Sequence, residues 1–389
     1  MRRYDPTVAC LNTGHVLVHL AMLIFPTAVL ALEPAWHIPY GQLLSLSLGG
    51  LVAYGAGSLP AGWLGDRWSR HHMMTIFFFG LGFALIATGL VQGPIGMAIG
   101  LTLIGLFASI YHPVGIAMLV ENRGKVGRAL GVNGVFGNAG IAGAALITGA
   151  LAQAIGWRAA FILPGALSIL AGIAFLLWVR PTPARAVERP RAAPVPARAL
   201  MWRIGFVLLL STVCDSIVFN ATTIAMPKVF AEHLAGWTHS TLEVGALLSF
   251  VYLVAAMAQL LVGHLIDRVS LRGLFVPIAA LQVPFLIAAS WAEGQIIIPV
   301  ALALMFLMFG LIPIGDAMVA QHVEESWRSR VYAVSYVTSF GAGPLAIPLI
   351  AALHVESGGF SALFLALAAI SIGTVAAAVL FPHRALARA

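Results

Sequence analysis

Five ionisable side chains lie inside long apolar stretches of the sequence, where a charge is costly to bury. His15 and His19 are four residues apart in the first of these stretches, and His112, Asp215 and Asp316 each lie in a different one. Imidazole changes its charge near neutral pH, and a buried carboxyl group can take up a proton. Both groups are also ligands for transition metals. We therefore consider these residues candidates for proton transfer or for metal binding.

Structural roles compete with these chemical ones. His15 and His19 share one face of a helix, where they could simply bond to backbone or Tyr groups. His112 precedes Pro113, which removes a backbone donor and bends a helix, so the histidine could serve the bend. Asp316 could have the purely structural role of neutralising charge near one end of its helix. The stretch around Asp215 contains no Lys or Arg, which favours a functional role there.

The composition places these residues in a membrane. Only 9% of the residues are charged and 60% are hydrophobic, whereas a typical soluble domain has about 25% charged residues. Lipid is the expected solvent for such a chain, and a spanning helix needs roughly 20 mainly apolar residues. The sequence predicts twelve spans: 8–31, 41–63, 72–91, 95–120, 127–154, 157–179, 204–228, 243–266, 273–291, 296–321, 330–353 and 360–381.

A segment rich in Pro, Ala and Arg, 180–203, separates the sixth span from the seventh. This composition is typical of a solvated linker. We therefore predict two six-helix bundles, 1–179 and 204–389, joined by a cytoplasmic linker.

The basic residues predict which side each loop faces. If both termini are cytoplasmic, 19 of the 21 Lys and Arg residues fall in cytoplasmic segments, and only Arg158 and Lys228 fall outside, as the positive-inside rule requires. The net charge of +7 is thus explained by topology and does not indicate a nucleic-acid partner. We expect a monomeric, multi-pass protein of the inner (plasma) membrane, with the lipid bilayer as its surroundings.

A repeat relates the two halves. Residues 62–70 read GWLGDRWSR and residues 263–272 read GHLIDRVSLR, each after the second span of its half. The segment resembles the cytoplasmic signature loop of the major facilitator superfamily. Residues 14–26, GHVLVHLAMLIFP, and 108–119, ASIYHPVGIAML, together with GNAGIAG in the fifth span, resemble the fosmidomycin-resistance branch of bacterial exporters within that superfamily.

This resemblance implies an all-α integral membrane fold of twelve transmembrane helices in two pseudo-symmetric six-helix bundles, which works by alternating access. It also implies that spans one, four, seven and ten line a central cavity, and those spans carry the ionisable residues. The expected substrate and proton cavity contains His15, His19, His112, Asp215, Asn220 and Asp316. His15 and His112 fall in one layer, roughly 7–8 Å from the midplane at about 1.5 Å per residue.

A cytoplasmic gate is expected at the repeated loops. Its residues are Gly62, Asp66, Arg67, Arg70, Asp267, Arg268, Arg128 and Arg330. A helix N-terminus attracts a carboxylate. We therefore expect Asp66 to lie against the start of span eleven, and Asp267 against the start of span five, when this side is shut. Glycines at 131, 134, 137, 140 and 143 also predict that another helix approaches span five closely.

Three functions are compatible with these patterns. The first is a proton-coupled carrier of a small organic solute, such as an antiporter that acts in efflux. The second is a transition-metal ion transporter that uses the intramembrane His and Asp residues. The third is a membrane sensor or scaffold, which the lack of a sizeable extramembrane domain disfavours. The sequence has no ATP-binding P-loop, nucleophile elbow, CxxC pair or zinc-protease helix, so we expect neither an enzyme nor a cofactor.

Overall fold

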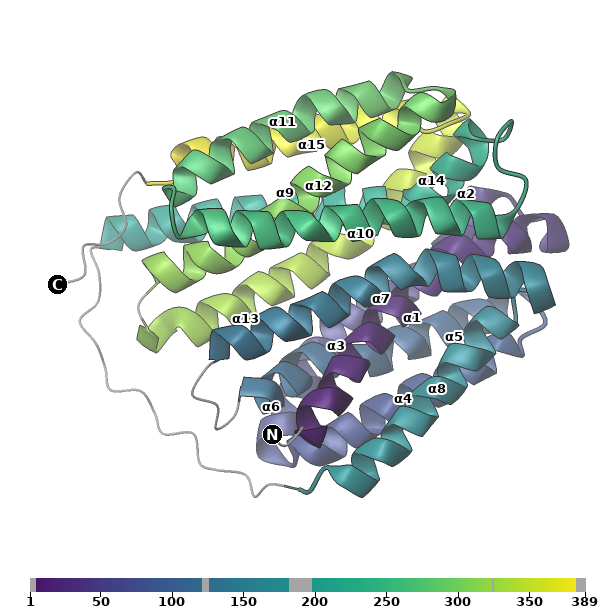
Figure 1. Ribbon diagram of the computed structural model, residues 1–389, viewed down its shortest axis with the longest axis horizontal. Coiled ribbons are helices and arrows are strands. Elements are labelled where there is room, and N and C mark those ends of the chain that lie inside the picture. Colours follow the sequence, from purple (N-terminus) through teal and green to yellow (C-terminus); the bar gives the residue numbers. More distant parts are fainter. Residues whose placement is uncertain (1–4, 121–125, 182–197, 324, 383–389) are drawn as a thin grey trace. The chain divides into compact units, whose positions relative to one another are not determined.

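The computed structural model describes residues 5–120, 126–181, 198–323 and 325–382, and these are helical with short connections (Figure 1). The helices are α1 Pro6–Trp36, α2 Tyr40–Ser45, α3 Leu48–Arg67, α4 Arg70–Gly89, α5 Pro94–Ala108, η1 Tyr111–Gly115, α6 Ile116–Val120, α7 Val126–Ile155, α8 Ala159–Trp178, α9 Arg198–His233, α10 Thr241–Ile266, α11 Leu271–Trp291, η2 Gly294–Ile296, α12 Ile297–His322, α13 Glu325–Ala342, η3 Gly343–Leu345, α14 Ala346–Ser357 and α15 Ser361–Leu380.

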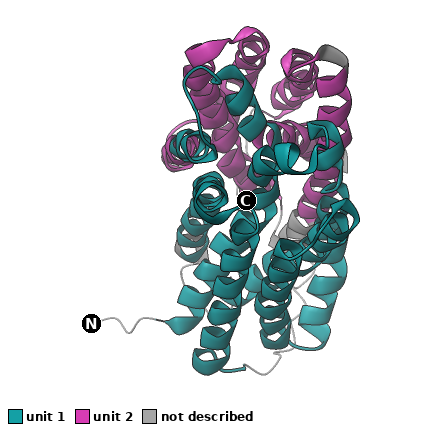
Figure 2. Cartoon of the chain, turned by 90° about the vertical axis from the view of Figure 1, so that its right-hand side faces the viewer, with its two compact units in different colours: residues 1–186, 224–250 teal, residues 187–223, 251–389 magenta. Residues whose placement is uncertain are grey.

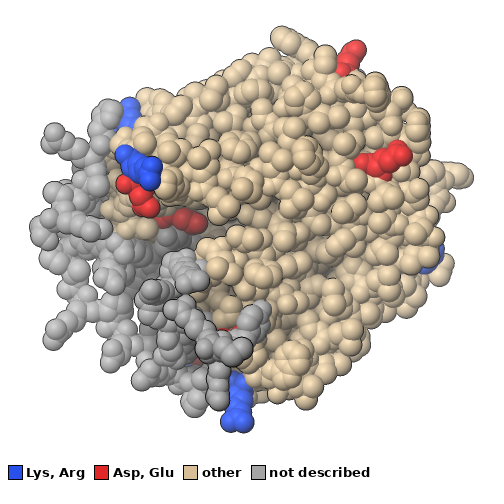
Figure 3. Space-filling model, in the orientation of Figure 1, with Lys and Arg blue, Asp and Glu red and all other residues tan. Residues whose placement is uncertain are grey.

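Twelve helical segments within the described ranges are long and apolar enough to cross a membrane, which confirms the predicted fold class and number of spans. The second span is α2 with α3, the fourth is α5 with η1 and α6, and the eleventh begins at Val334 within α13. Charged side chains are sparse on the face that Figure 3 shows. An apolar outer surface of this kind matches the hydrocarbon of a bilayer.

The chain divides into two compact units (Figure 2). Unit 1 comprises residues 1–186 and 224–250, and unit 2 comprises residues 187–223 and 251–389. Because α9 and α10 each contribute to both units, the units differ from a simple division of the chain at a linker. The predicted bundle boundaries at 179 and 204 stay a prediction, and most of the expected linker, 182–197, lies outside the described residues.

Unit 1 is built from pairs of helices that pack along their lengths. The most extensive pairings are α1 with α7, α4 with α8, and α3 with α5. In unit 2, α11 packs against α15 and α12. The core there includes Phe275 of α11, Ile314 of α12 and Ala377 of α15, all almost completely buried.

The fourth span is interrupted where the sequence predicts a bend. Residues Tyr111–Gly115 form one turn of π-helix between α5 and α6. Pro113 in this turn has no N–H to give to the carbonyl of Ser109, four residues earlier. The hydroxyl of Ser58 in α3 instead lies 3.3 Å from that carbonyl oxygen. Gly62 of α3 faces the same turn, because a Cβ there would lie 3.2 Å from Pro113 Cβ.

The crossing of α3 and α5 depends on two glycines. A Cβ on Gly50 would lie 2.6 Å from the carbonyl oxygen of Leu101, and a Cβ on Gly105 would collide with the carbonyl of Gly50. The obstacles are backbone atoms, which cannot rotate away as a side chain can. The two helices therefore reach their observed separation only while both positions lack a side chain.

We predict that Gly105→Ala lowers the stability of the protein by about 1–3 kcal/mol, the range for an overpacked interface. Thermal unfolding of the purified protein in detergent would measure the fall in melting temperature. Gly131→Ala is the matched control, because a Cβ on Gly131 has nothing within 4 Å and alanine is the better helix former. Equal melting temperatures for the two variants would contradict this account of the crossing.

Candidate functional site

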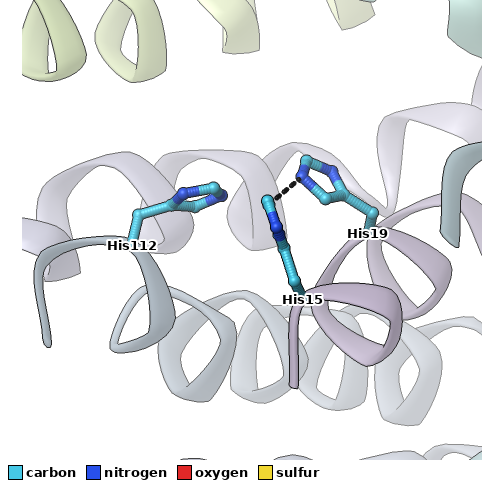
Figure 4. A group of neighbouring side chains, drawn as sticks. All are labelled: His15, His19 and His112. Carbon is cyan, nitrogen blue, oxygen red and sulfur yellow. Dashed lines mark hydrogen bonds between the residues drawn. The ribbon is translucent and has the colours of Figure 1, made fainter. Parts of the chain in front are cut away.

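Three histidines of unit 1 come together in a cluster, which we call the histidine triad: His15, His19 and His112. The first two project from α1 and the third from the π-turn η1, and their rings converge (Figure 4). The Nε2 atoms of His15 and His19 are 3.1 Å apart. The ring of His112 lies 5.3 Å from that of His15 and 5.5 Å from that of His19, between centroids. His15 and His112 are thus close neighbours, and their expected depth relative to the midplane stays a prediction.

A network of buried polar groups holds His15 in place. Its Nδ1 lies 2.7 Å from the backbone carbonyl oxygen of Asn133 in α7. The side-chain amide of Asn133 donates to Asn12 Oδ1 and to the hydroxyl of Tyr111, both at 2.9 Å. That hydroxyl donates in turn to the carbonyl of Leu11 at 2.7 Å. Fully bonded networks of this kind fix side-chain orientation in a low-dielectric interior.

Two glycines of α7 make room for the triad. A Cβ on Gly137 would lie 2.6 Å from Cε1 of His15, and a Cβ on Gly140 would lie 3.1 Å from Cβ of His19. By contrast, a Cβ on Gly131 or Gly134 would meet nothing within 4 Å. The glycine repeat of the fifth span therefore permits close approach only along its middle part.

The two aspartates belong to unit 2. A cavity of about 290 Å³ lies within unit 2, bounded by α9, α11, α12 and α13. Its polar lining includes Asp215, Asp316, Asn220, Gln282, Ser216 and Tyr336. The remainder is mostly apolar, and no Lys or Arg is found among the described residues that line it.

The two carboxylates occupy distinct settings in this cavity. Thr374 of α15 bonds to Asp215 Oδ1 at 2.6 Å. Asp316 of α12 is the more exposed of the two. Asn220 donates to the carbonyl of Ser216 at 2.8 Å. The histidines thus belong to unit 1, and the aspartates with Asn220 belong to unit 2. Their expected membership of one cavity stays a prediction.

The repeated loops show local contacts. Arg70 pairs with Asp66 one turn earlier at 2.8 Å, and the guanidinium of Arg67 lies 5.5 Å from the centre of the Trp63 ring. Asp267 and Arg268 are exposed. The side chains of Arg128 and Arg330 lie outside the described residues. The expected contacts of Asp66 with span eleven and of Asp267 with span five stay predictions.

Several residues of both sites were not identified from the sequence. Asn133 and Tyr111 support the triad, and Gln282 and Thr374 contribute to the cavity or to Asp215. The sequence also did not reveal an ion pair of unit 1 outside the two sites. In it, Lys228 Nζ lies 2.5 Å from Glu33 Oε2 and 3.5 Å from Glu232 Oε1. The available signal was a polar residue in an otherwise apolar span, which does not reveal its partner.

Comparison with known proteins agrees with this architecture. The family model of the Major Facilitator Superfamily matches residues 11–312 and 208–388. The structure of a bacterial homologue of the human lysosomal transporter Spinster, in an inward-facing and occupied conformation, superimposes with a TM-score of 0.78 at 15% identity, covering 96% of this chain and 95% of that one. At this identity the likeness shows the fold.

Among curated sequences, the tetracenomycin C resistance and export protein of Streptomyces glaucescens is 28% identical over 52% of this chain and 38% of its own length. The multidrug resistance protein MdtG of Enterobacter lignolyticus (strain SCF1) is 26% identical over 93% of this chain and 88% of its own. The alignment therefore spans well under half of the first relative but most of the second.

The fosmidomycin-resistance branch stays a prediction. From the extent of the family match and the twelve spans, the chain belongs to the Major Facilitator Superfamily and is a multi-pass membrane transporter.

Proposed function

We propose that the protein is a secondary active exporter, which exchanges protons for a small amphipathic organic cation by alternating access. The observation that carries this proposal is the cavity of unit 2, in which two carboxylates and aromatic and aliphatic side chains line one space without a basic residue among the described lining. Apolar walls with a few convergent polar groups are typical of small-molecule sites. An anionic solute would be repelled by Asp215 and Asp316.

The carboxylates supply a reason for proton coupling. An ionised carboxylate at membrane depth is costly unless a counter-ion or a proton neutralises it. A proton and an organic cation can each neutralise Asp215 or Asp316, and binding of one favours release of the other. This competition is what an antiporter needs. The cavity volume of about 290 Å³ is just below the range of about 300–1,000 Å³ for drug-sized ligands, so a small solute fits it best.

The names of the relatives support export as the direction of transport. One relative is named for resistance to and export of tetracenomycin C, another for multidrug resistance, and a third, from Streptomyces alboniger, for puromycin resistance. Export would require the cavity to load from the cytoplasm and to empty on the other side. The predicted orientation, with both termini cytoplasmic, fits this use.

Vesicles containing the purified protein provide the test. With an acidic interior, proton efflux should drive a permanently charged aryl phosphonium cation into the vesicles, while valinomycin and equal K⁺ hold the membrane potential at zero. A permanent charge prevents passive trapping by pH. Uptake that persists after the pH gradient is collapsed, or that occurs only for anionic solutes, would refute the proposal.

We predict that Asp215→Asn reduces gradient-driven accumulation of the cation by about tenfold or more, because an interaction with a charged group contributes about 1.5–3 kcal/mol. Asparagine keeps the shape and the contact with Thr374 but cannot exchange a proton. Glu293→Gln is the control, because it removes an exposed carboxylate of unit 2 outside the cavity. Full accumulation by the Asp215→Asn protein would remove this residue from the coupling step.

Alternating access also requires contacts that break on the side opposite the signature loops. Glu33 and Lys228, at the ends of α1 and α9, are suited to this role, since their side chains are 30% and 15% exposed and form an ion pair. Removing the lysine leaves Glu33 and Glu232 as neighbouring like charges. The closed arrangement of these ends should then lose stability.

We predict that Lys228→Met raises the ratio of molecules with separated α1 and α9 ends to molecules with closed ends by about fivefold. Loss of the ion pair should destabilise the closed arrangement by about 1 kcal/mol, which corresponds to that factor. Spin labels at positions 37 and 236, with Cys10 and Cys214 replaced, would report the distance distribution. Arg158→Met is the control, because this arginine bonds to Val91 and Gln92 and not to the Glu33 pair. An unchanged distribution for Lys228→Met would argue against the ion pair as a latch.

A further inference from the structure

We propose that the histidine triad of unit 1 is a binding site for one divalent first-row transition metal ion, such as Zn²⁺ or Co²⁺. One nitrogen from each of His15, His19 and His112 lies within 4.8 Å of the others. Two nitrogens bound tetrahedrally to one zinc ion at about 2.0–2.1 Å are about 3.3 Å apart. The Nε2 atoms of His15 and His19 are already 3.1 Å apart, and only the ring of His112 needs to approach.

The hydrogen bonds of His15 orient it as a metal ligand. Its Nδ1 faces the carbonyl oxygen of Asn133, and a carbonyl can only accept a hydrogen bond. Nδ1 therefore carries the proton, and neutral His15 directs the lone pair of Nε2 into the triad (Figure 4). In the absence of an ion, the Nε2–H of His19 must supply the hydrogen between the two rings. A metal ion takes the place of that hydrogen once His19 shifts its proton to Nδ1.

The surroundings resemble the supporting shell of known metal sites. A metal-binding histidine usually donates its other N–H to a carbonyl or carboxylate, which fixes its tautomer and ring orientation. Asn133 provides this carbonyl and is itself held by Asn12 and Tyr111. The ring of Tyr111 also stacks on His15, with centroids 5.0 Å apart. These contacts fix His15 before any ion arrives.

The ligand set restricts the identity of the ion. Imidazole suits zinc, cobalt, nickel and copper, whereas calcium and magnesium take oxygen ligands. Three histidines leave a fourth tetrahedral position open, as in sites where zinc also holds a water molecule or a substrate. The ion would therefore be accessible to an oxygen or nitrogen donor of a small molecule. The π-turn that carries His112 is consistent with this use, because such turns often occur at functional sites.

The triad shares no residue with the lining of the cavity proposed for the organic cation. Asp215 and Asp316 line the cavity of unit 2, whereas the triad belongs to unit 1. Metal binding and cation transport can therefore be measured separately, and either can fail without the other.

The experiment uses the full chain in detergent, purified through a tag that contains no histidine. Titration with Co²⁺ should give the visible absorption of a tetrahedral nitrogen site at one ion per chain, and calorimetry with Zn²⁺ should give the same stoichiometry. His19→Ala and His112→Ala should each abolish the tetrahedral spectrum. Asn133→Ala removes the side-chain bonds to Asn12 and Tyr111 but keeps the backbone carbonyl that faces His15, so it should weaken binding less than the loss of a ligand does.

Matched controls use histidines outside the triad. His72→Ala removes an exposed imidazole, and His71→Ala removes a buried one that bonds to the carbonyl of Val179; both should bind Co²⁺ as the unaltered protein does. Size-exclusion chromatography checks folding, and His112→Gln replaces His112→Ala if the latter aggregates. The proposal is overturned if no tetrahedral spectrum develops, or if the triad variants bind as the controls do.

Discussion

The absence of water from the hydrocarbon region is the constraint on which the rest of the structure depends. Each backbone N–H and C=O within a span must find a partner inside the protein. Helices satisfy most of this demand, but a proline inside a helix leaves one carbonyl without its usual donor. The fourth span shows how a neighbouring helix can answer such a gap. Where Pro113 withdraws a donor from α5 and η1, the hydroxyl of Ser58 on a neighbouring helix lies within hydrogen-bonding distance of the Ser109 carbonyl. The same turn then carries His112 toward α1.

This constraint explains why the spans could be predicted from the sequence. A helix that must be apolar over roughly 20 residues has a composition that can be read directly, and all twelve predicted spans correspond to helices. The places where a span is interrupted were harder to predict. Pro113 predicted a bend, but the break between α2 and α3 near Leu46 has no proline or charge inside it. At this break the hydroxyls of Ser45 and Ser47 donate to the carbonyls of Gly41 and Leu44, each at 2.7 Å.

The functional residues show the same division. Ionisable side chains are costly in lipid and therefore rare in spanning helices. This rarity identified five candidates in the sequence, which are His15, His19, His112, Asp215 and Asp316. Which of them meet depends on lateral packing. Gly137 and Gly140 let α7 approach α1 beside the histidines. Asn133, whose carbonyl orients His15, is one amide among several in the chain and had no feature in the sequence to distinguish it.

The length of α9 has a mechanical consequence. Its 36 residues extend for about 54 Å at about 1.5 Å per residue, whereas the hydrocarbon layer is only about 30 Å thick. Much of the helix must therefore lie beyond the lipid tails, and each end is about 27 Å from the midpoint. A tilt of about 10° about that midpoint would move each end by about 5 Å. Lys228 lies about 19 Å from the midpoint and would move by about 3 Å, so a modest tilt of this one helix is enough to part Lys228 from Glu33.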